Sequence, residues 1–249
     1  MTRTNLLCLT YLIVIAGAEL ITALVNQLGG IIFHFVILIS LIFSSAVFAK
    51  SQFQRLFLSL GLAPLIRIIN FSAPMAQFSE IYWFLFVSIP LLAGIFTIVM
   101  IANLQPSEIG LTVDTIRIQG LIALSGIGIG LIEYLILKPE PLLPALSWQE
   151  TIAPALILLV ATGFVEELAF RGVIQSASVP ALGRWGWIYV ALLYSILQIG
   201  HLSALHWIFV LLVSLFFGWV VKRKGSIFGV SLAHGITNIS LYLIFPFII

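Results

Sequence analysis

Long runs of apolar residues separated by short polar breaks dominate the pattern along this chain. A helix that spans a membrane needs about 20 mainly apolar residues, and several stretches reach or approach that length. They are residues 5–28, 30–48, 53–71, 81–101, 118–137, 151–175, 186–203, 205–221 and 226–249. The pattern predicts an all-α fold, a polytopic membrane helix bundle with about eight or nine transmembrane helices.

The predicted spans are not equally strong. Arg55 and Arg67 lie in 53–71, and the beginning of this stretch, KSQFQRLF, also suits a helix lying in the membrane interface. The break between 186–203 and 205–221 is so short that these two spans should form a tight helical hairpin. The first stretch has the basic start of a signal peptide, but we expect a retained helix, because its apolar run continues and further spans follow.

The composition agrees with a membrane protein. The chain is 61% hydrophobic and 8% charged, whereas a soluble domain is about 25% charged, so a water-soluble globule is excluded. A net charge of +2 is too small to indicate a nucleic-acid partner. Cys8 is the single cysteine, which excludes an internal disulfide framework and a cysteine-cluster metal site.

Lysine and arginine positions predict the orientation, because these residues are enriched in cytoplasmic loops. Nine spans with a cytoplasmic N-terminus place most of them on the cytoplasmic side and the C-terminus outside. The cytoplasmic set is Arg3, Lys50, Arg55, Arg117, Arg171, Arg184 and the run 222–224, leaving Arg67 and Lys138 near the other side. We expect an integral protein of a bacterial plasma membrane. We also expect its active site, whose candidate residues are given below, to open toward the cytoplasm.

A polar, proline-rich stretch, KPEPLLPALSWQE at 138–150, divides the chain. Residues 1–137 are mostly plain spans and form the predicted N-terminal transmembrane part. Most of the candidate functional polar groups lie after 150, in a predicted core domain at 150–245.

Charged groups inside these spans are functional candidates, because each costs about 2.5–3.5 kcal/mol to insert. The candidates in the second half are clustered, whereas Glu19 and Glu133 are isolated acids. The clusters are Glu166-Glu167 with Arg171, then His201, then His234 with Asn238.

Glu167 and Arg171 are four residues apart, with the acid on the N-terminal side, which is the favourable order for a helical ion pair. Glu166 is rotated by about 100° from Glu167 on an α-helix and has no obvious partner on its own helix. An acid without a partner in an apolar site suits general acid–base chemistry. We therefore expect Glu167 to hold structure and Glu166 to carry chemistry.

His234 and Asn238 share one face of the last helix, where an imidazole and an amide can donate to one oxyanion. At about 1.5 Å per residue, Glu166 lies about 15 Å from the cytoplasmic end of its span, His201 about 20 Å and His234 about 12 Å. Their similar depths predict that three separate helices bring these groups to one place.

At these residues the sequence resembles the CAAX protease and bacteriocin-processing family (CPBP or ABI), the Rce1-like intramembrane glutamic proteases. The family pattern is EExxxR, then FxxxH, then HxxxN or HxxxD. Here it reads Glu166 to Arg171, Leu197 to His201, with leucine in place of the usual phenylalanine, and His234 to Asn238. The resemblance covers about 150–245, and the ordered set is far more specific than any one part.

The resemblance implies an intramembrane endopeptidase that uses a glutamate-activated water and no cofactor. Glu166 and His201 would activate the water, His234 and Asn238 would stabilise the oxyanion, and Glu167 and Arg171 would support the site. The partners would be the lipid bilayer and a peptide or protein substrate, lipidated or not, as in CAAX-type processing or a related bacterial activity.

Other interpretations remain open at this stage. Glu166, His201 and His234 could bind Zn²⁺ as a His₂Glu site in a zinc-dependent membrane protease, although HExxH is absent. Glu19 and Glu133 are expected to be protonated acids bonded to neighbouring helices, but could form the path of a proton-coupled transporter. A non-catalytic scaffold of the same family is a third class. His206 is expected at the outer interface.

Overall fold

The computed structural model describes residues 3–72, 79–113 and 115–249. These residues form helices joined by short connections and contain no strand, which confirms the all-α prediction. The α-helices are α1 (Arg3–Leu24), α2 (Gln27–Val47), α3 (Gln52–Leu60), α4 (Leu62–Ser72), α5 (Glu80–Ile101), α6 (Ile116–Leu137), α7 (Trp148–Ile157), α8 (Val165–Glu167), α9 (Gln175–Leu182), α10 (Gly186–Ile196), α11 (Ala204–Lys224), α12 (Phe228–Ile239) and α13 (Phe245–Ile248). Shorter helical turns join some of them: η2 (Leu158–Phe164), η3 (Leu168–Ile174), η4 (Gly183–Trp185), η5 (Ile199–His201) and η6 (Ser240–Ile244).

By length and composition, 8 described helices can cross a membrane. One of them, 148–201, has 54 residues and contains two of the predicted spans, which turn back on each other at η4. The doubtful third span is present as Gln52–Ser72, where α3 and α4 join at Gly61. The predicted hairpin is also present, because only residues 197–203, which include the η5 turn, separate α10 from α11.

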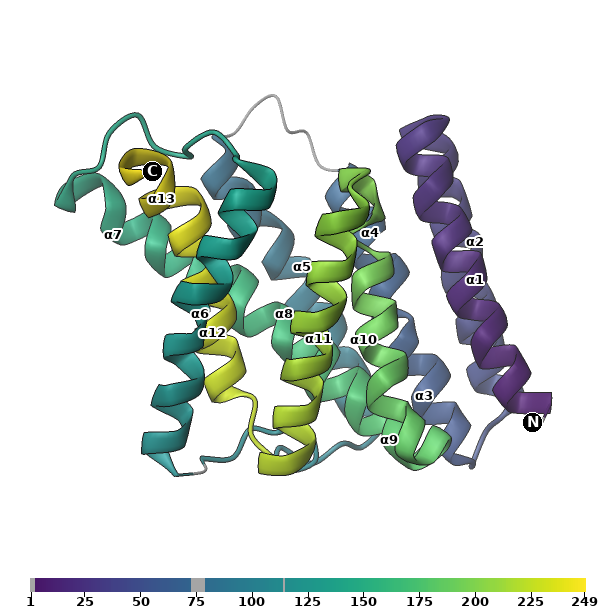
Figure 1. Ribbon diagram of the computed structural model, residues 1–249. Helices are drawn as coiled ribbons and strands as arrows, with labels where there is room; N and C mark the ends of the chain where they lie inside the picture. The colour runs from purple at the N-terminus through teal and green to yellow at the C-terminus, as the bar shows by residue number, and fades with distance from the viewer. Residues whose placement is uncertain (1–2, 73–78, 114) are drawn as a thin grey trace.

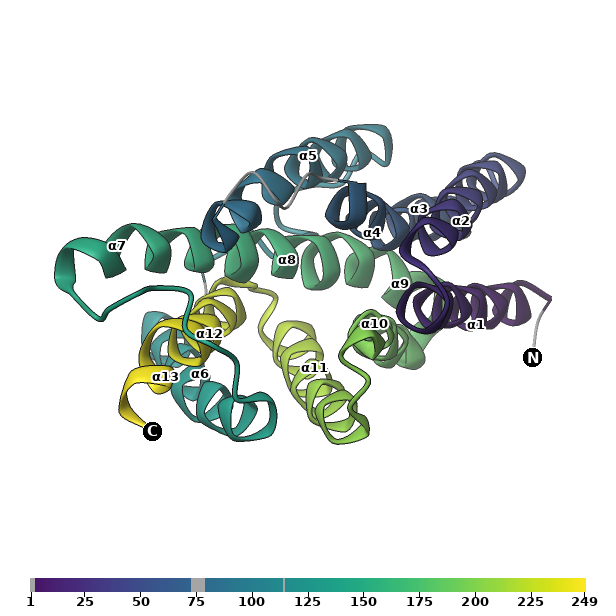
Figure 2. The same ribbon diagram turned by 90° about the horizontal axis from the view of Figure 1, so that it is seen from above.

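The helices stand roughly side by side, and the two chain ends lie on opposite edges of the bundle (Figure 1). From above, the long helix from α7 through α8 to α9 crosses the middle of the molecule (Figure 2). The helices α4 and α5 lie on one side of it, and α6, α12, α11 and α10 lie on the other (Figure 2). The central position of α8 places the Glu166-Glu167 pair inside the bundle.

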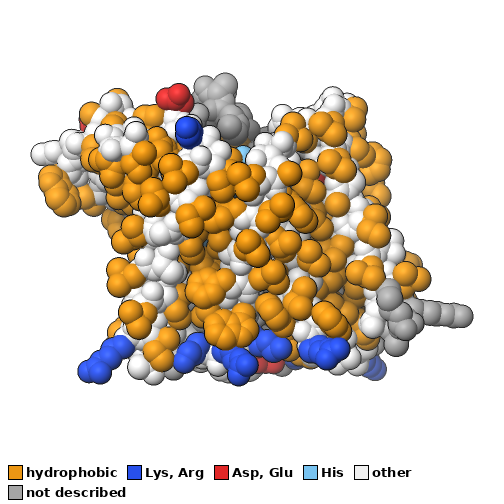
Figure 3. All heavy atoms as spheres, viewed as in Figure 1, with side chains coloured by type: hydrophobic (Ala, Val, Ile, Leu, Met, Phe, Trp, Pro, Cys, Tyr) orange, Lys and Arg blue, Asp and Glu red, His pale blue; other side chains and the backbone are white. Residues whose placement is uncertain are grey.

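The outer surface is mainly apolar, unlike the polar surface of a soluble protein. Apolar side chains cover the visible face from edge to edge, and Lys and Arg side chains gather along the edge that holds the N-terminus (Figure 3). Helices with apolar outward faces are stable where lipid surrounds them. The lysine and arginine edge lies at the lower ends of α6 and α11 in Figure 1.

Two glycines allow the close packing that carries the C-terminal helices to the centre. A methyl group at Gly126 of α6 would collide with the backbone of Ala233 in α12. At Gly163 of η2 it would lie 2.6 Å from the carbonyl oxygen of Ser231 and 2.8 Å from Gly235. Small residues at such contacts let helix backbones approach closely, and these contacts hold α12 against both α6 and η2.

Candidate active site

The chain around the glutamate pair is not a regular α-helix. The turns η2 and η3 are π-helical, and α8 is a single short α-helical stretch between them. A π-turn hydrogen-bonds from i to i+5 and so changes which side chains share a face; such turns are frequent at functional sites. The regular helix assumed from the apolar run of 151–175 therefore does not describe the surroundings of Glu166 and Glu167.

Glu167 is fully buried and joins two helices through one carboxylate oxygen. Its Oε1 lies 2.9 Å from Nη1 of Arg171 and 2.9 Å from Nδ1 of His234. The other terminal nitrogen of Arg171 donates to Oγ of Ser214 in α11 at 2.7 Å. The ion pair predicted from the sequence is present, but the bond to His234 was not foreseen.

Glu166 turns away from this pair and toward a cavity. Its Oε2 accepts a hydrogen bond of 3.2 Å from the hydroxyl of Tyr194 in α10. The Tyr194 ring is held edge-on by Phe170 at 4.9 Å and lies 4.5 Å from the Arg171 guanidinium. Glu166 therefore has a hydrogen-bond partner on α10, although it has none on its own helix.

Asn238 approaches Glu166 from the C-terminal helices. Its Nδ2 donates to Oγ1 of Thr162 at 2.8 Å, and Thr162 in turn donates to the carbonyl oxygen of Leu158. Because Thr162 lies one turn before Glu166, this bond fixes the amide beside the acid. One amide hydrogen and the amide oxygen of Asn238 are left for the cavity.

His201 lies in η5, at the end of α10 opposite Gly186, and it is exposed. Among the described residues no hydrogen bond or ion pair joins it to Glu166. Its ring packs edge-on against His206, with 4.5 Å between the ring centroids.

His206 was expected at the outer interface, but it is only 2% exposed, and its Nε2 lies 3.0 Å from Oε1 of Glu133. The partly buried carboxylate of Glu133 on α6 accounts for this inward position of an imidazole. Glu19, the other isolated acid, contacts Nε of Arg67 at 2.7 Å and lies 3.2 Å from Nε2 of His34. Both acids therefore meet polar groups on neighbouring helices, as expected, but Glu19 forms an ion pair with Arg67, whereas the sequence predicted a protonated acid.

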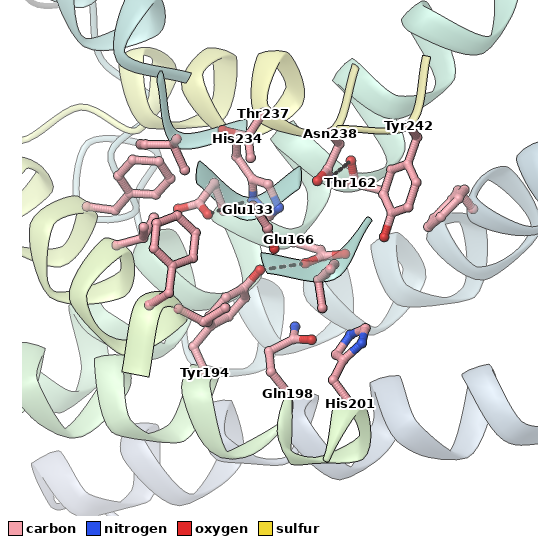
Figure 4. A pocket seen from close by; sticks show the side chains of 18 of the residues that line it. Glu133, Thr162, Glu166, Tyr194, Gln198, His201, His234, Thr237, Asn238 and Tyr242 are labelled. Carbon is pink, nitrogen blue, oxygen red and sulfur yellow. Dashed lines mark hydrogen bonds and ion pairs between the residues drawn. The ribbon is translucent and has the colours of Figure 1, made fainter. Parts of the chain in front are cut away.

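One cavity of about 240 Å³ brings the candidates together. Figure 4 shows Tyr194, Gln198 and His201 approaching Glu166 from one side, and His234, Asn238 and Tyr242 approaching from the other. All six residues that the sequence singled out line this cavity: Glu166, Glu167, Arg171, His201, His234 and Asn238. The volume is sufficient for several water molecules.

Sequence reasoning missed several polar groups on the cavity wall. Tyr194 and Gln198 precede His201 by seven and three residues, so the three share one helical face, and that spacing could have revealed them. Thr162 stands four residues before Glu166, which is a weaker signal. Arg67 and Glu133 were noticed as charges within spans, but nothing in the pattern placed them at this cavity.

A neighbouring cavity of about 460 Å³ lies between α4, α5 and η2. The two share Arg67, Asn70, Phe84, Thr162 and Glu166. Glu166 therefore stands where a mainly polar space meets a space with walls of Trp83, Phe84 and Leu91. Within the described part of the chain, no three His, Cys, Asp or Glu side chains are grouped so that they could hold a metal ion.

Comparison with known proteins agrees with the motifs. Residues 148–240 match the family described as type II CAAX prenyl endopeptidase Rce1-like. No curated protein matches the chain, and no solved structure does. The matched segment starts with α7 and ends at the beginning of η6, so it contains all three motifs. The match supports the CAAX protease family that the motifs indicated, and the segment 148–240 of this membrane protein is Rce1-like.

Proposed function

We propose that the protein is an intramembrane endopeptidase in which Glu166 activates a water molecule. The observation that carries this proposal is the coincidence of two findings. The segment 148–240 is Rce1-like, and the three family motifs, far apart in sequence, line one cavity with Glu166 at its centre.

The reaction needs a base, an oxyanion site and an acid, and the cavity offers all three. Glu166 takes a proton from water, and the hydroxide attacks the carbonyl carbon of the cleaved peptide bond. The protonated Glu166 then returns this proton to the departing amine as the tetrahedral intermediate collapses. His201 borders the same cavity, and Tyr194 orients the Glu166 carboxylate through its hydroxyl.

His234 and Asn238 supply the oxyanion site. The Nδ1 of His234 is engaged by Glu167, so its Nε2 can donate to an oxyanion only when the ring is the imidazolium. Glu167 lies beside the ring as the counter-ion of that imidazolium, and Arg171 pairs with Glu167 in turn. Asn238 adds its second amide hydrogen, which Thr162 does not use.

The substrate in this proposal is a membrane-associated peptide or protein in a bacterial plasma membrane. The lysine and arginine edge in Figure 3 suggests that the ends of α6 and α11 with this edge face the cytoplasm. The sequence also predicted a site open to the cytoplasm, but the exposed His201 lies at the far end of α10 from that edge. We therefore infer that the cavity opens toward the other side.

The deciding experiment is cleavage of a membrane-peptide library by purified protein in detergent, wild type against Glu166→Gln. This substitution keeps the size of the side chain and removes its base. We expect cleavage by the wild type, none by Glu166→Gln, and the same melting temperature in a thermal-shift measurement. Full activity in a folded Glu166→Gln would exclude the glutamate mechanism.

Chelation separates the remaining alternatives. A glutamate mechanism needs no metal, so we expect cleavage to persist in EDTA or phenanthroline. Activity that disappears on chelation and returns with Zn²⁺ would instead establish the metalloprotease. A folded wild type that cleaves no member of a broad library would favour the scaffold or the transporter.

A further inference from the structure

Arg67 lies in α4, outside the Rce1-like segment, yet it reaches the proposed catalytic cavity. Three cavities meet at its side chain. They are the cavity around Glu166, the neighbouring one with Trp83 and Phe84, and a third of about 320 Å³ that also borders His201. A cationic group at such a junction faces anything that occupies the space next to Glu166.

The two arginines of this region differ in what their terminal nitrogens do. Arg171 uses Nη1 for Glu167 and Nη2 for Ser214. Arg67 uses only Nε, which donates to Glu19 at 2.7 Å, and its Nη atoms bond to none of the described residues. Its side chain is only 15% exposed, so these unused donors face the cavities that meet at Arg67.

Glu19 holds the guanidinium in a defined position. Its carboxylate is 1% exposed and accepts from the Nε edge, and the Phe71 ring lies 5.6 Å from the Arg67 Cζ. The fixed plane leaves the Nη fork for a second ligand. A carboxylate matches such a fork with two parallel hydrogen bonds. Asn70, three residues further along α4, lines the same two cavities and adds an amide.

We propose that Arg67 binds the C-terminal carboxylate of the peptide substrate and so fixes which peptide bond reaches Glu166. This proposal rests on the proposed peptidase function and adds a binding residue from the N-terminal helices. Because Arg67 and Glu166 border the same cavities, a carboxylate held there places the cleaved bond close to the C-terminus of the substrate.

The test compares two peptides that are cleaved by the wild type and differ only at the C-terminus, one a free acid and the other an amide. We expect the wild type to prefer the acid by about 10- to 100-fold in kcat/KM, mainly through KM, as for a hydrogen bond to a charged group. Arg67→Gln should cleave both peptides at the rate of the amide. Arg55→Gln removes an exposed arginine near Glu108 and should keep the preference.

A purely structural role of Arg67, as the counter-ion of Glu19, predicts a different outcome. If Arg67→Gln does not fold, the double variant Glu19→Gln with Arg67→Gln removes both buried charges and restores a neutral pair. A folded single or double variant that still prefers the acid would overturn the proposal. Equal cleavage of both peptides by the wild type would also overturn it, while leaving the peptidase function in place.

A phosphate group is the other anion that the guanidinium could bind. The assay is therefore run in a maltoside detergent, which has no phosphate, and repeated with added anionic phospholipid. Persistence of the acid preference in both conditions supports the peptide carboxylate. Phospholipid inhibition that requires Arg67, without any acid preference, would assign the site to a lipid headgroup and exclude our proposal. Failure of the wild type to cleave any member of the peptide library from which the two peptides are chosen would refute the peptidase function and this inference with it.

Discussion

At the scale of single residues, the Glu167 carboxylate has two roles: it is the counter-ion of Arg171, and it binds the proposed catalytic residue His234. Its Oε1 contacts both Arg171 and His234. Glu167→Ala should lower stability by about 3–5 kcal/mol, because it leaves Arg171 buried without a counter-ion. Adding Arg171→Met should recover much of this loss, whereas peptide cleavage should stay low because His234 still lacks its partner. Thermal shift measures the stability and a peptide assay measures the cleavage rate. If the double variant recovered both, Glu167 would act only as the counter-ion of Arg171.

Tyr194 offers a test with a matched control on the same helix. Tyr194→Phe keeps the ring contacts with Phe170 and Arg171 but removes the hydroxyl bonded to Glu166. We expect kcat to fall by about 10- to 100-fold, the value of a hydrogen bond to a charged group, with little change in melting temperature. Tyr189→Phe removes a hydroxyl that donates to the Cys8 backbone instead and should leave the rate unchanged. Equal rates for both variants would contradict the role of Tyr194.

Asn238 should behave as one donor of an oxyanion site. Asn238→Ala should lower kcat by about 10²-fold, the usual loss for such a donor, and leave KM nearly unchanged. Thr162→Val removes only the hydroxyl that fixes the amide, so it should reduce kcat less. Steady-state kinetics of the two variants provide the measurement, and a Thr162→Val enzyme slower than Asn238→Ala would assign the larger role to the threonine.

At the scale of elements, the sequence predicted the spans well because each apolar run had to be long enough to cross a bilayer. The predicted stretch 118–137, for example, is observed as Ile116–Leu137. The π-turns on both sides of Glu166 could not be predicted, because an apolar run has the same composition in an α-helix and a π-helix. The partners of Glu166 and Glu167 were missed for the same reason: they lie on α10 and α12, and span patterns do not specify which helices meet.

The packing of α6 against α12 gives a test of element position. Gly126→Ala places a methyl group on the backbone of Ala233, one residue before His234, so α12 must shift. We expect a lower melting temperature and slower cleavage. Gly128→Ala, two residues away, meets nothing within 4 Å and should be neutral or stabilising by up to about 1 kcal/mol, since alanine favours helices over glycine. Similar effects of the two variants would show that close packing at Gly126 does not position α12.

At the scale of the whole molecule, the sequence and the fold give different predictions for the side of the membrane on which the cavity opens. The sequence predicted an opening toward the cytoplasm, whereas the position of His201 in the fold favours the opposite side. Lys222, Arg223 and Lys224 end α11 at the edge we assign to the cytoplasm. His201 lies at the other end of the hairpin. The sequence alone placed Glu166, His201 and His234 by counting along separate helices. It could not foresee that the helix through Glu166 continues obliquely from α7 to α9, which changes the distance from either membrane surface.

Labelling of single cysteines can settle both points. In a Cys8→Ala background, which removes the buried native thiol, Lys222→Cys, His201→Cys and Ile249→Cys are expressed separately and treated in intact cells with a membrane-impermeant maleimide. We expect Ile249→Cys and His201→Cys to react, because both positions are exposed at the outer edge, and Lys222→Cys to react only after lysis. Labelling of Lys222→Cys in intact cells, with protection of the other two, would invert the molecule and turn the cavity toward the cytoplasm. Protection of His201→Cys alone would contradict the inferred opening of the cavity at that edge.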